Sequence, residues 1–248
     1  MGLPKLAIPE YTLQLPSDGR EIRYRPFLVK EEKLLLMAME TEDEQQILRA
    51  TKRVLQSCVN GNINADTLPT FDFEYIFLWL RAKSKGEEID LKYKCPKCEG
   101  EIQLLFNVED VKMTTSKDHA SKVAITDTLG VQLRYPDLNL QVKLDTLKDE
   151  SEIEKVFKTV LWCIDFIYDK ENTYSNKDHT EKELEDFLES LTDGQFQKLA
   201  KFFETMPKLK HDVKLECKNK IKGEGKKKDK PCGYTEEISL EGLQSFFA

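Results

Sequence analysis

The feature that most constrains this chain is a pair of cysteines separated by proline and lysine, Cys95-Pro96-Lys97-Cys98. An alternating segment, 89–94, leads into the pair and another apolar segment, 102–106, follows it, which predicts a β-hairpin with the cysteines at its tip. Cysteines at this spacing in a tight turn are typical ligands of a tetrahedral zinc ion. The pattern therefore predicts half of a zinc site and requires two further ligands from elsewhere.

The C-terminal segment repeats this arrangement. Strand-like residues 213–216 run into Cys217, and strand-like residues 234–240 follow Cys232. Two such hairpins facing each other bring four thiolates to one ion, so we expect Cys95, Cys98, Cys217 and Cys232 to hold a structural zinc. Fourteen residues separate Cys217 from Cys232, where a compact knuckle has two. Two alternatives stay open: a zinc held by Cys95 and Cys98 with other partners, and no metal.

Composition limits the class of protein. The chain has 248 residues, 40% of them hydrophobic, which is enough to bury a core, and its net charge of -7 argues against general nucleic-acid binding. No apolar run has the roughly 18 to 20 residues that span a bilayer, and residues 1–8 lack the apolar core of a signal peptide. Six cysteines are too few for a secreted disulfide scaffold. We therefore expect a protein of the cytoplasm, without membrane contact.

The remaining pattern indicates an α+β fold. Hydrophobic periodicity predicts a hairpin over 11–27, strands over 131–135 and 138–142, and helices over 29–39, 47–58, 71–80, 153–168, 181–190 and 192–206. Residues 112–127 are polar. The expected architecture is an N-terminal β-hairpin and helical body with a split zinc ribbon of two β-hairpins, the second formed by the C-terminal segment. We expect three regions: 1–88, then 89–110 with 208–248, and the inserted 111–207.

No catalytic constellation is apparent. His119, His179 and His211 lie in polar segments without a second ligand at helical spacing, and the carboxylates of 181–189 read as a solvated helix face. Cys58 and Cys163 lie on apolar helix faces and are expected in the core. Residues 208–230 carry ten lysines against four acidic residues. A solvated loop that is mobile and dispensable over 218–230 explains them best, and a zinc-ribbon nucleic-acid-binding protein is the alternative.

Both ends of the chain carry a family resemblance. The opening includes Tyr11-Thr12-Leu13-Gln14-Leu15-Pro16 and Arg25-Pro26-Phe27-Leu28-Val29-Lys30, and the ending includes Cys232-Gly233-Tyr234 and Leu240-Glu241-Gly242-Leu243. These segments resemble the baseplate hub protein family of T-even-type contractile-tailed bacteriophages. The resemblance implies a hub subunit or hub assembly factor that binds other baseplate hub proteins. It implies no enzyme, no small-molecule substrate, and a location in the host cytoplasm during assembly or in the virion tail.

The N-terminal region carries both the family-like motif and apolar residues that could complete another protein's surface. We therefore expect Phe27, Leu34 and Leu35 to take part in partner binding. The alternative for these three residues is an ordinary place in the core.

Overall fold

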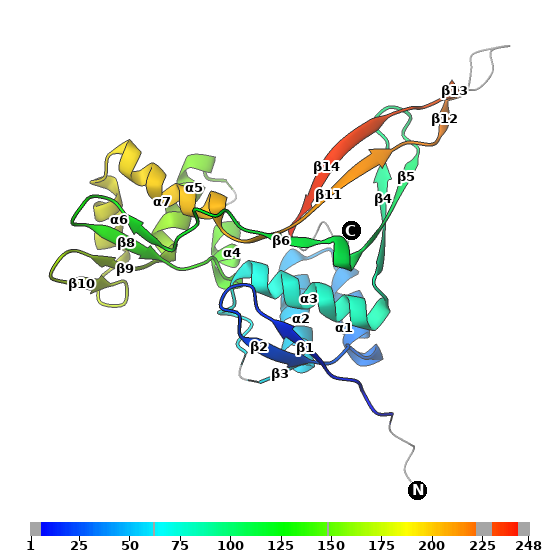
Figure 1. Ribbon diagram of the computed structural model, residues 1–248, viewed down its shortest axis with the longest axis horizontal. Helices are drawn as coiled ribbons and strands as arrows, with labels where there is room; N and C mark the ends of the chain where they lie inside the picture. Colours follow the sequence, from blue (N-terminus) through cyan, green and yellow to red (C-terminus); the bar gives the residue numbers. More distant parts are fainter. Residues whose placement is uncertain (1–5, 62, 148, 222–229, 243–248) are drawn as a thin grey trace, which may run out of the picture. The chain divides into compact units, whose positions relative to one another are not determined.

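The computed structural model describes residues 6–61, 63–147, 149–221 and 230–242 (Figure 1). Backbone contacts divide the chain into two compact units. The first comprises Met1–Ile63, Phe71–Thr114 and Lys208–Ala248, and the second comprises Asn64–Thr70 and Thr115–Pro207. Helices and small antiparallel sheets occur in both, so the predicted α+β class is confirmed.

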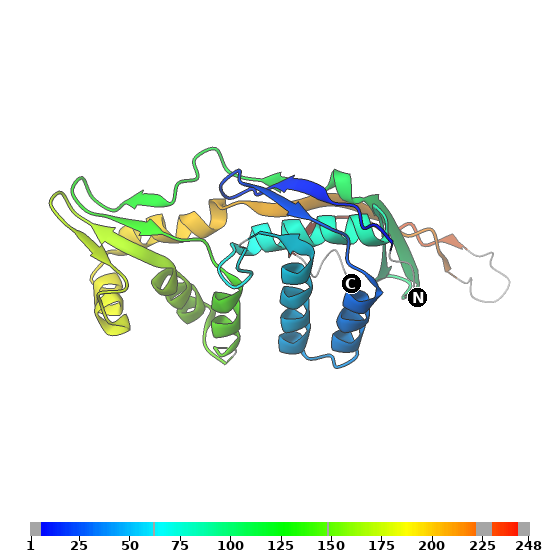
Figure 2. The same ribbon diagram turned by 90° about the horizontal axis from the view of Figure 1, so that it is seen from below.

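The first unit begins with a β-hairpin and three helices. Its elements here are β1 (Tyr11–Gln14), β2 (Glu21–Tyr24), α1 (Val29–Met39), α2 (Glu44–Cys58), β3 (Val59–Asn60) and α3 (Thr70–Lys85). β3 adds to the hairpin to give the antiparallel order β1-β2-β3. Figure 2 shows α1 and α2 side by side as a helical pair. A carboxylate accepts hydrogen bonds at the start of both helices: Asp43, the N-cap of α2, accepts from the backbone N–H groups of Gln45 and Gln46, and Glu31 in the first turn of α1 accepts from that of Leu28.

Helix α3 is the centre of this part of the fold. Its residues Phe71, Phe73, Ile76 and Leu80 are buried, which agrees with the apolar run in the sequence. Lys83 and Lys85 occupy the last turn, where positive charge suits the carbonyl end of a helix, and Gly86 with φ +107° ends it. Buried Asp72 accepts hydrogen bonds from the backbone N–H and hydroxyl of Ser17, which ties the hairpin turn to α3.

Two long hairpins complete the first unit. One pairs β4 (Glu88–Lys94) with β5 (Glu101–Asn107), and the other pairs β11 (Lys208–Glu216) with β14 (Thr235–Glu241). On its other side β11 pairs with β6 (Lys112–Thr114), and β12 (Lys220–Ile221) pairs with β13 (Lys230–Pro231). A short 3-10 turn, Val108–Asp110, follows β5. Residues from both hairpins share one core with α3, including Leu91, Leu209, Leu240 and Leu78.

The described residues of the second unit form a four-stranded antiparallel sheet and four helices. Its elements are β7 (Lys122–Ala124), β8 (Gly130–Leu133), α4 (Leu138–Asp145), α5 (Glu152–Cys163), β9 (Ile164–Tyr168), β10 (Thr173–Ser175), α6 (Glu181–Glu189) and α7 (Asp193–Thr205). The strand order is β10-β9-β8-β7. A core of its own, formed largely by the sheet and α5 to α7, includes Val131, Val160, Ile164 and Leu199.

Two local predictions were wrong, and a segment without a predicted element contains strands. Residues 138–142 form the start of α4 and no strand, because the Asp137 side chain accepts from the N–H of Leu140 and caps a helix there. The helix predicted over 153–168 ends at Cys163, and β9 continues the chain because it pairs with both β8 and β10. The polar segment 112–127 contributes the short strands β6 and β7.

Candidate metal centre

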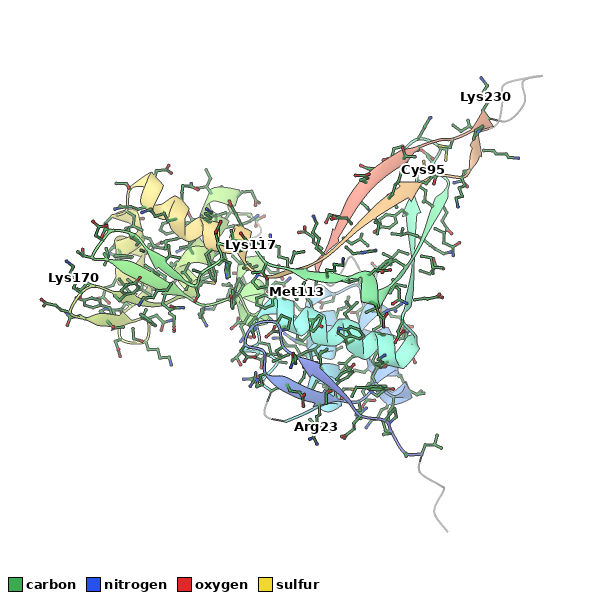
Figure 3. All side chains as sticks on the ribbon, viewed as in Figure 1. Arg23, Cys95, Met113, Lys117, Lys170 and Lys230 are labelled. Atoms are coloured by element: carbon green, nitrogen blue, oxygen red, sulfur yellow. The ribbon has the colours of Figure 1, made fainter. Side chains whose placement is uncertain are left out.

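All four cysteines of the predicted site lie where a long hairpin strand begins or ends. Cys95 follows β4, as labelled in Figure 3, and Cys217 follows β11. Cys98 and Cys232 precede β5 and β14 by three residues each. Cys95, Cys217 and Cys232 are buried and Cys98 is half-buried, among apolar side chains that include Ile102 and Leu215. Two hairpins far apart in the sequence therefore bring their cysteines to one place.

The sulfur atoms form a compact cluster. All four Sγ atoms lie within 4.8 Å of one another, with Cys95 and Cys232 at 3.7 Å and Cys98 and Cys217 at 3.5 Å. A regular tetrahedron with metal–sulfur bonds of about 2.3 Å has sulfur–sulfur edges of about 3.8 Å. A disulfide needs a sulfur–sulfur distance of about 2.05 Å, so neither close pair is bonded. The spacing fits four thiolates around one ion.

The first knuckle, the hairpin tip from Cys95 to Gly100, is a tight turn closed by backbone hydrogen bonds. The N–H of Cys95 donates to the carbonyl of Gly100, and the N–H of Glu99 donates to the carbonyl of Cys95, both at 2.8 Å. The left-handed residue of this turn is Glu99, with φ 58°. Gly100 serves another purpose, because a Cβ there would lie 2.5 Å from Nδ2 of Asn219 in the second hairpin. The two knuckles are thus packed against each other.

The second knuckle stays closed despite its long sequence separation. The N–H of Cys232 donates to the carbonyl of Asn219 at 2.7 Å, and the N–H of Cys217 donates to the carbonyl of Tyr234 at 2.9 Å. Beyond them β12 pairs with β13 through Lys220 and Pro231. The predicted mobility of 218–230 falls mainly on residues 222–229, which lie outside the described residues.

The surroundings of the sulfur atoms set their protonation. Burial raises the pKa of the Cys95 thiol, but the backbone N–H groups of Cys98 and Lys97 outweigh burial and lower that pKa to about 7. Burial raises the pKa of Cys217, and raises that of Cys232 to about 12 with neighbouring thiols adding to the effect. Four thiols this close together cannot all ionise without a cation, because each thiolate makes ionisation of its neighbours less favourable. A divalent ion would supply the missing positive charge.

Other potential ligands do not join the cluster. In the part of the chain that the structure describes, these four cysteines are the one group of three or more metal-binding side chains within reach of each other. The ring of His119 contacts Thr205 at 3.0 Å and Tyr135 at 2.9 Å, and that of His211 packs on Phe106.

The remaining two cysteines are core residues, as their apolar surroundings in the sequence predict. Cys58 and Cys163 are buried, and burial raises the pKa of both, that of Cys163 to about 12.

Of the residues predicted to bind a partner, Phe27 precedes α1, and Leu34 and Leu35 lie in the middle of that helix. Phe27 is buried, and Leu34 and Leu35 are half-buried. The apolar side chains that α1 exposes are different ones, which sequence reasoning did not separate from the buried ones: Val29, Leu36, Met37 and Met39. Val29 and Leu36 lie on the side of the helix opposite buried Ala38, so their spacing could have identified them as exposed, whereas Met37 and Met39 flank Ala38 and their spacing does not.

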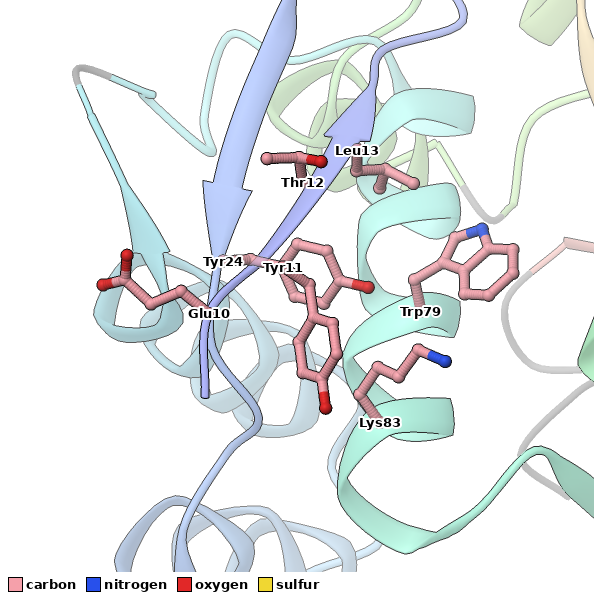
Figure 4. A pocket seen from close by; sticks show the side chains of 7 residues that line it. All are labelled: Glu10, Tyr11, Thr12, Leu13, Tyr24, Trp79 and Lys83. Carbon is pink, nitrogen blue, oxygen red and sulfur yellow. The ribbon is translucent and has the colours of Figure 1, made fainter. Parts of the chain in front are cut away.

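A shallow cavity of about 420 Å³ opens between β1 and α3 (Figure 4). Its lining is Glu10, Tyr11, Thr12, Leu13, Tyr24, Trp79 and Lys83. The Lys83 ammonium lies 5.6 Å from the Tyr11 ring centre and pairs with Glu87 at 2.6 Å. The ammonium is therefore already neutralised by a neighbouring carboxylate. Nothing in this lining pairs a nucleophile with a base.

The fold and the cluster define an α+β protein in which two β-hairpins close around four cysteines arranged for a metal. A family model described as "T4 bacteriophage base plate protein" matches residues 8–248. The chain belongs to this family and is a T4-type phage baseplate protein. Comparison with curated proteins and with solved structures gives no match. Among the described residues, no helix has both the length and the apolar character needed to cross a membrane.

Proposed function

We propose that this baseplate protein acts in the central hub of the tail baseplate, as a hub subunit or as a factor required for hub assembly. The family match over nearly the whole chain is the observation that carries the proposal. The family-like segments at both ends of the chain support the hub rather than another part of the baseplate. Its partners would be other phage hub proteins, met in the host cytoplasm during assembly.

We further propose that Cys95, Cys98, Cys217 and Cys232 hold a structural zinc ion. Four sulfur ligands in a tetrahedral arrangement favour zinc or an iron–sulfur centre among biological metals, and zinc needs no further inorganic ligand. With four protein ligands the ion would have no open position for a substrate or water. Such a site stabilises a fold, and it supports the proposal that the protein is not an enzyme.

Partner contacts are proposed for the N-terminal region, at Phe27, Leu34 and Leu35. The exposure of neighbouring apolar side chains on α1 supports this region, since large apolar groups in water favour association. Leu36 and Met37, each about half exposed at 50% and 57%, make the sharper test. Polar substitutions there remove apolar contact area without opening the core, whereas substitution of Phe27 would also disturb packing.

One experiment separates the two hub roles. A tagged protein is isolated from infected cells and its partners are identified, and purified tails are examined by mass spectrometry in parallel. A hub subunit is expected in both samples, and an assembly factor only with hub proteins from cells. Absence from both would contradict the hub proposal, and DNA binding that weakens from low to moderate salt would favour the zinc-ribbon nucleic-acid-binding alternative.

A further inference from the structure

One order of elements occurs twice along the chain. A β-hairpin, two helices and a third strand appear first as β1-β2-α1-α2-β3 and again as β7-β8-α4-α5-β9. In both sets the third strand runs antiparallel to the second strand of the hairpin, as β2 with β3 and β8 with β9. The last helix residue before the third strand is a buried cysteine in each set, Cys58 and Cys163.

The two sets also share an arginine that joins hairpin to helix. The backbone N–H of Arg25 donates to the carbonyl of Cys58 at 2.9 Å, and that of Arg134 donates to the carbonyl of Cys163 at 2.8 Å. Each guanidinium also donates to the carbonyl of the residue before that cysteine, from Arg25 to Ser57 at 3.0 Å and from Arg134 to Trp162 at 2.7 Å. These carbonyls end a helix and lack helical partners, so a cation there is favourable.

The agreement continues into the long hairpins. β4 begins three residues after the end of α3, and β11 begins three residues after the end of α7. In each hairpin the residue before the first cysteine pairs with the third residue after the second cysteine, as Lys94 with Glu101 and Glu216 with Thr235.

The knuckles themselves match in their backbone. The first cysteine donates its N–H to the second residue after the second cysteine, from Cys95 to Gly100 and from Cys217 to Tyr234. The residue directly after the second cysteine is left-handed in both, with φ 58° at Glu99 and 62° at Gly233.

We infer that the chain contains two copies of one module, residues 11–107 and 122–241, and that the cysteine cluster is built from one equivalent knuckle of each. The likeness rests on four separate features: the sheet order, an arginine with two matching hydrogen bonds, the helix-to-hairpin spacing, and the backbone conformation of the knuckle. A chance likeness of two small α+β segments would not reproduce all four. Residues 218–231 then occupy the place of Pro96 and Lys97 and are an insertion in the second knuckle.

The test exchanges one knuckle for the other in the full chain. Residues 218–231 are replaced by Pro-Lys, and zinc per chain and thermal unfolding are measured. We expect the zinc content of the unaltered protein, about one ion per chain, because the strand ends and cysteines keep their places. The matched control carries Cys217→Ser in the same shortened chain and is expected to lose the metal.

The zinc measurements distinguish the proposed zinc site from the proposed equivalence of the two knuckles. The metal part of this inference rests on the proposed zinc site, and a folded but zinc-free unaltered protein would contradict that site alone. A zinc-loaded unaltered protein beside a folded, zinc-free shortened chain would overturn the equivalence of the knuckles.

A second pair of variants decides the case in which the shortened chain does not fold. Arg25→Met and Arg134→Met are compared by hydrogen exchange in the full chain. Equivalent modules predict about tenfold faster exchange, at β3 for the first variant and at β9 for the second, with zinc retained in both. Loss of protection in only one of them would count against the duplication.

Discussion

At the scale of single residues, a few side chains and backbone angles determine the arrangement of the cysteine cluster. The backbone N–H groups of Cys95, Cys217 and Cys232 each donate to a carbonyl near the tip of the same hairpin, from Gly100, Tyr234 and Asn219. Left-handed Glu99 turns the first knuckle, and buried Glu31 fixes the start of α1. These positions are sensitive to substitution for different physical reasons, so each gives a separate prediction.

Cys95→Ser should reduce zinc content from about one ion per chain to near zero and lower thermal stability together. The reason is that metal binding energy becomes folding energy where the unfolded chain has no site. Elemental analysis and thermal unfolding of the untagged protein measure both. Cys58→Ser is the matched control: it buries a hydroxyl and lowers stability, but should leave the zinc content unchanged. Equal zinc in the two variants would contradict the assignment.

Glu99→Gly should increase the free energy of unfolding by about 0.5–1 kcal/mol, because a left-handed backbone is strained for a residue with a Cβ. Glu42, with φ 54° in the turn after α1, is a second such residue outside the knuckle. Glu42→Gly should give a similar gain by denaturant unfolding. A loss of stability in Glu99→Gly alone would show that the Glu99 side chain has a role in the knuckle.

Glu31 should make stability depend on pH. Its burial raises the pKa of the carboxyl, but the Arg25 guanidinium at 2.9 Å and the N–H of Leu28 outweigh burial, so the pKa lies below the ordinary value of 4.5. Below pH 4.5 the unfolded chain binds the proton more readily than the folded chain, so this stabilisation is present above that pH and is lost on further acidification.

Urea unfolding at pH 7 and pH 4 of the unaltered protein and of Glu31→Gln measures this effect. The variant should be less stable at pH 7 by about 1–3 kcal/mol, through the lost charged hydrogen bonds. The difference between the two proteins should be smaller at pH 4. A difference of the same size at both pH values would contradict the role of the Glu31 charge.

At the scale of elements, helix ends and sheet pairings decide what each segment becomes. Capping side chains open α2, α4 and α5, at Asp43, Asp137 and Ser151. The end of α5 is set from outside the helix, because Ile164–Tyr168 finds hydrogen-bond partners on both β8 and β10. In β9 the buried residues are Ile164 and Ile167, and this spacing of three does not show the alternation that would distinguish a strand from a helix.

At the scale of the whole molecule, the two units have separate cores. The core of the second unit contains none of the four clustered cysteines, and those cysteines belong to a small apolar cluster at the tips of the long hairpins. The strands β6 and β11, at the two ends of the inserted second unit, pair with each other through Thr114 and Lys208. The longer segment of the second unit, Thr115–Pro207, therefore leaves and re-enters the first unit at paired residues.

Removal of the metal should accordingly unfold only part of the protein. With a zinc chelator, hydrogen exchange should become faster in β4, β5, β11 and β14 near the cysteines, because local opening there no longer breaks metal bonds. Helices α5 to α7 and the sheet β7 to β10 should keep their protection. Cooperative loss of protection throughout the chain would contradict separate cores, and no change at the hairpins would contradict a structural metal.

Features that depend on neighbouring residues in the chain were predictable from the amino-acid sequence. Two cysteines at a hairpin tip, the repeated strand–cysteine pattern, the apolar run of α3 and the basic last turn before Gly86 are all local signals. They were enough for the α+β class, for the four candidate ligands and for the core positions of Cys58 and Cys163.

Features that depend on contacts between distant residues were not predictable in this way. Cys98 and Cys217 lie 119 positions apart, and their approach to 3.5 Å requires two hairpins to pack side by side. Strand β9 also depends on distant contacts, because it is a strand through its pairing with neighbouring strands. Burial depends on them too: Phe27 is buried, whereas Leu36 in the following helix is exposed. Local periodicity reports which face of an element is apolar, but the packing of other elements decides which apolar faces are covered.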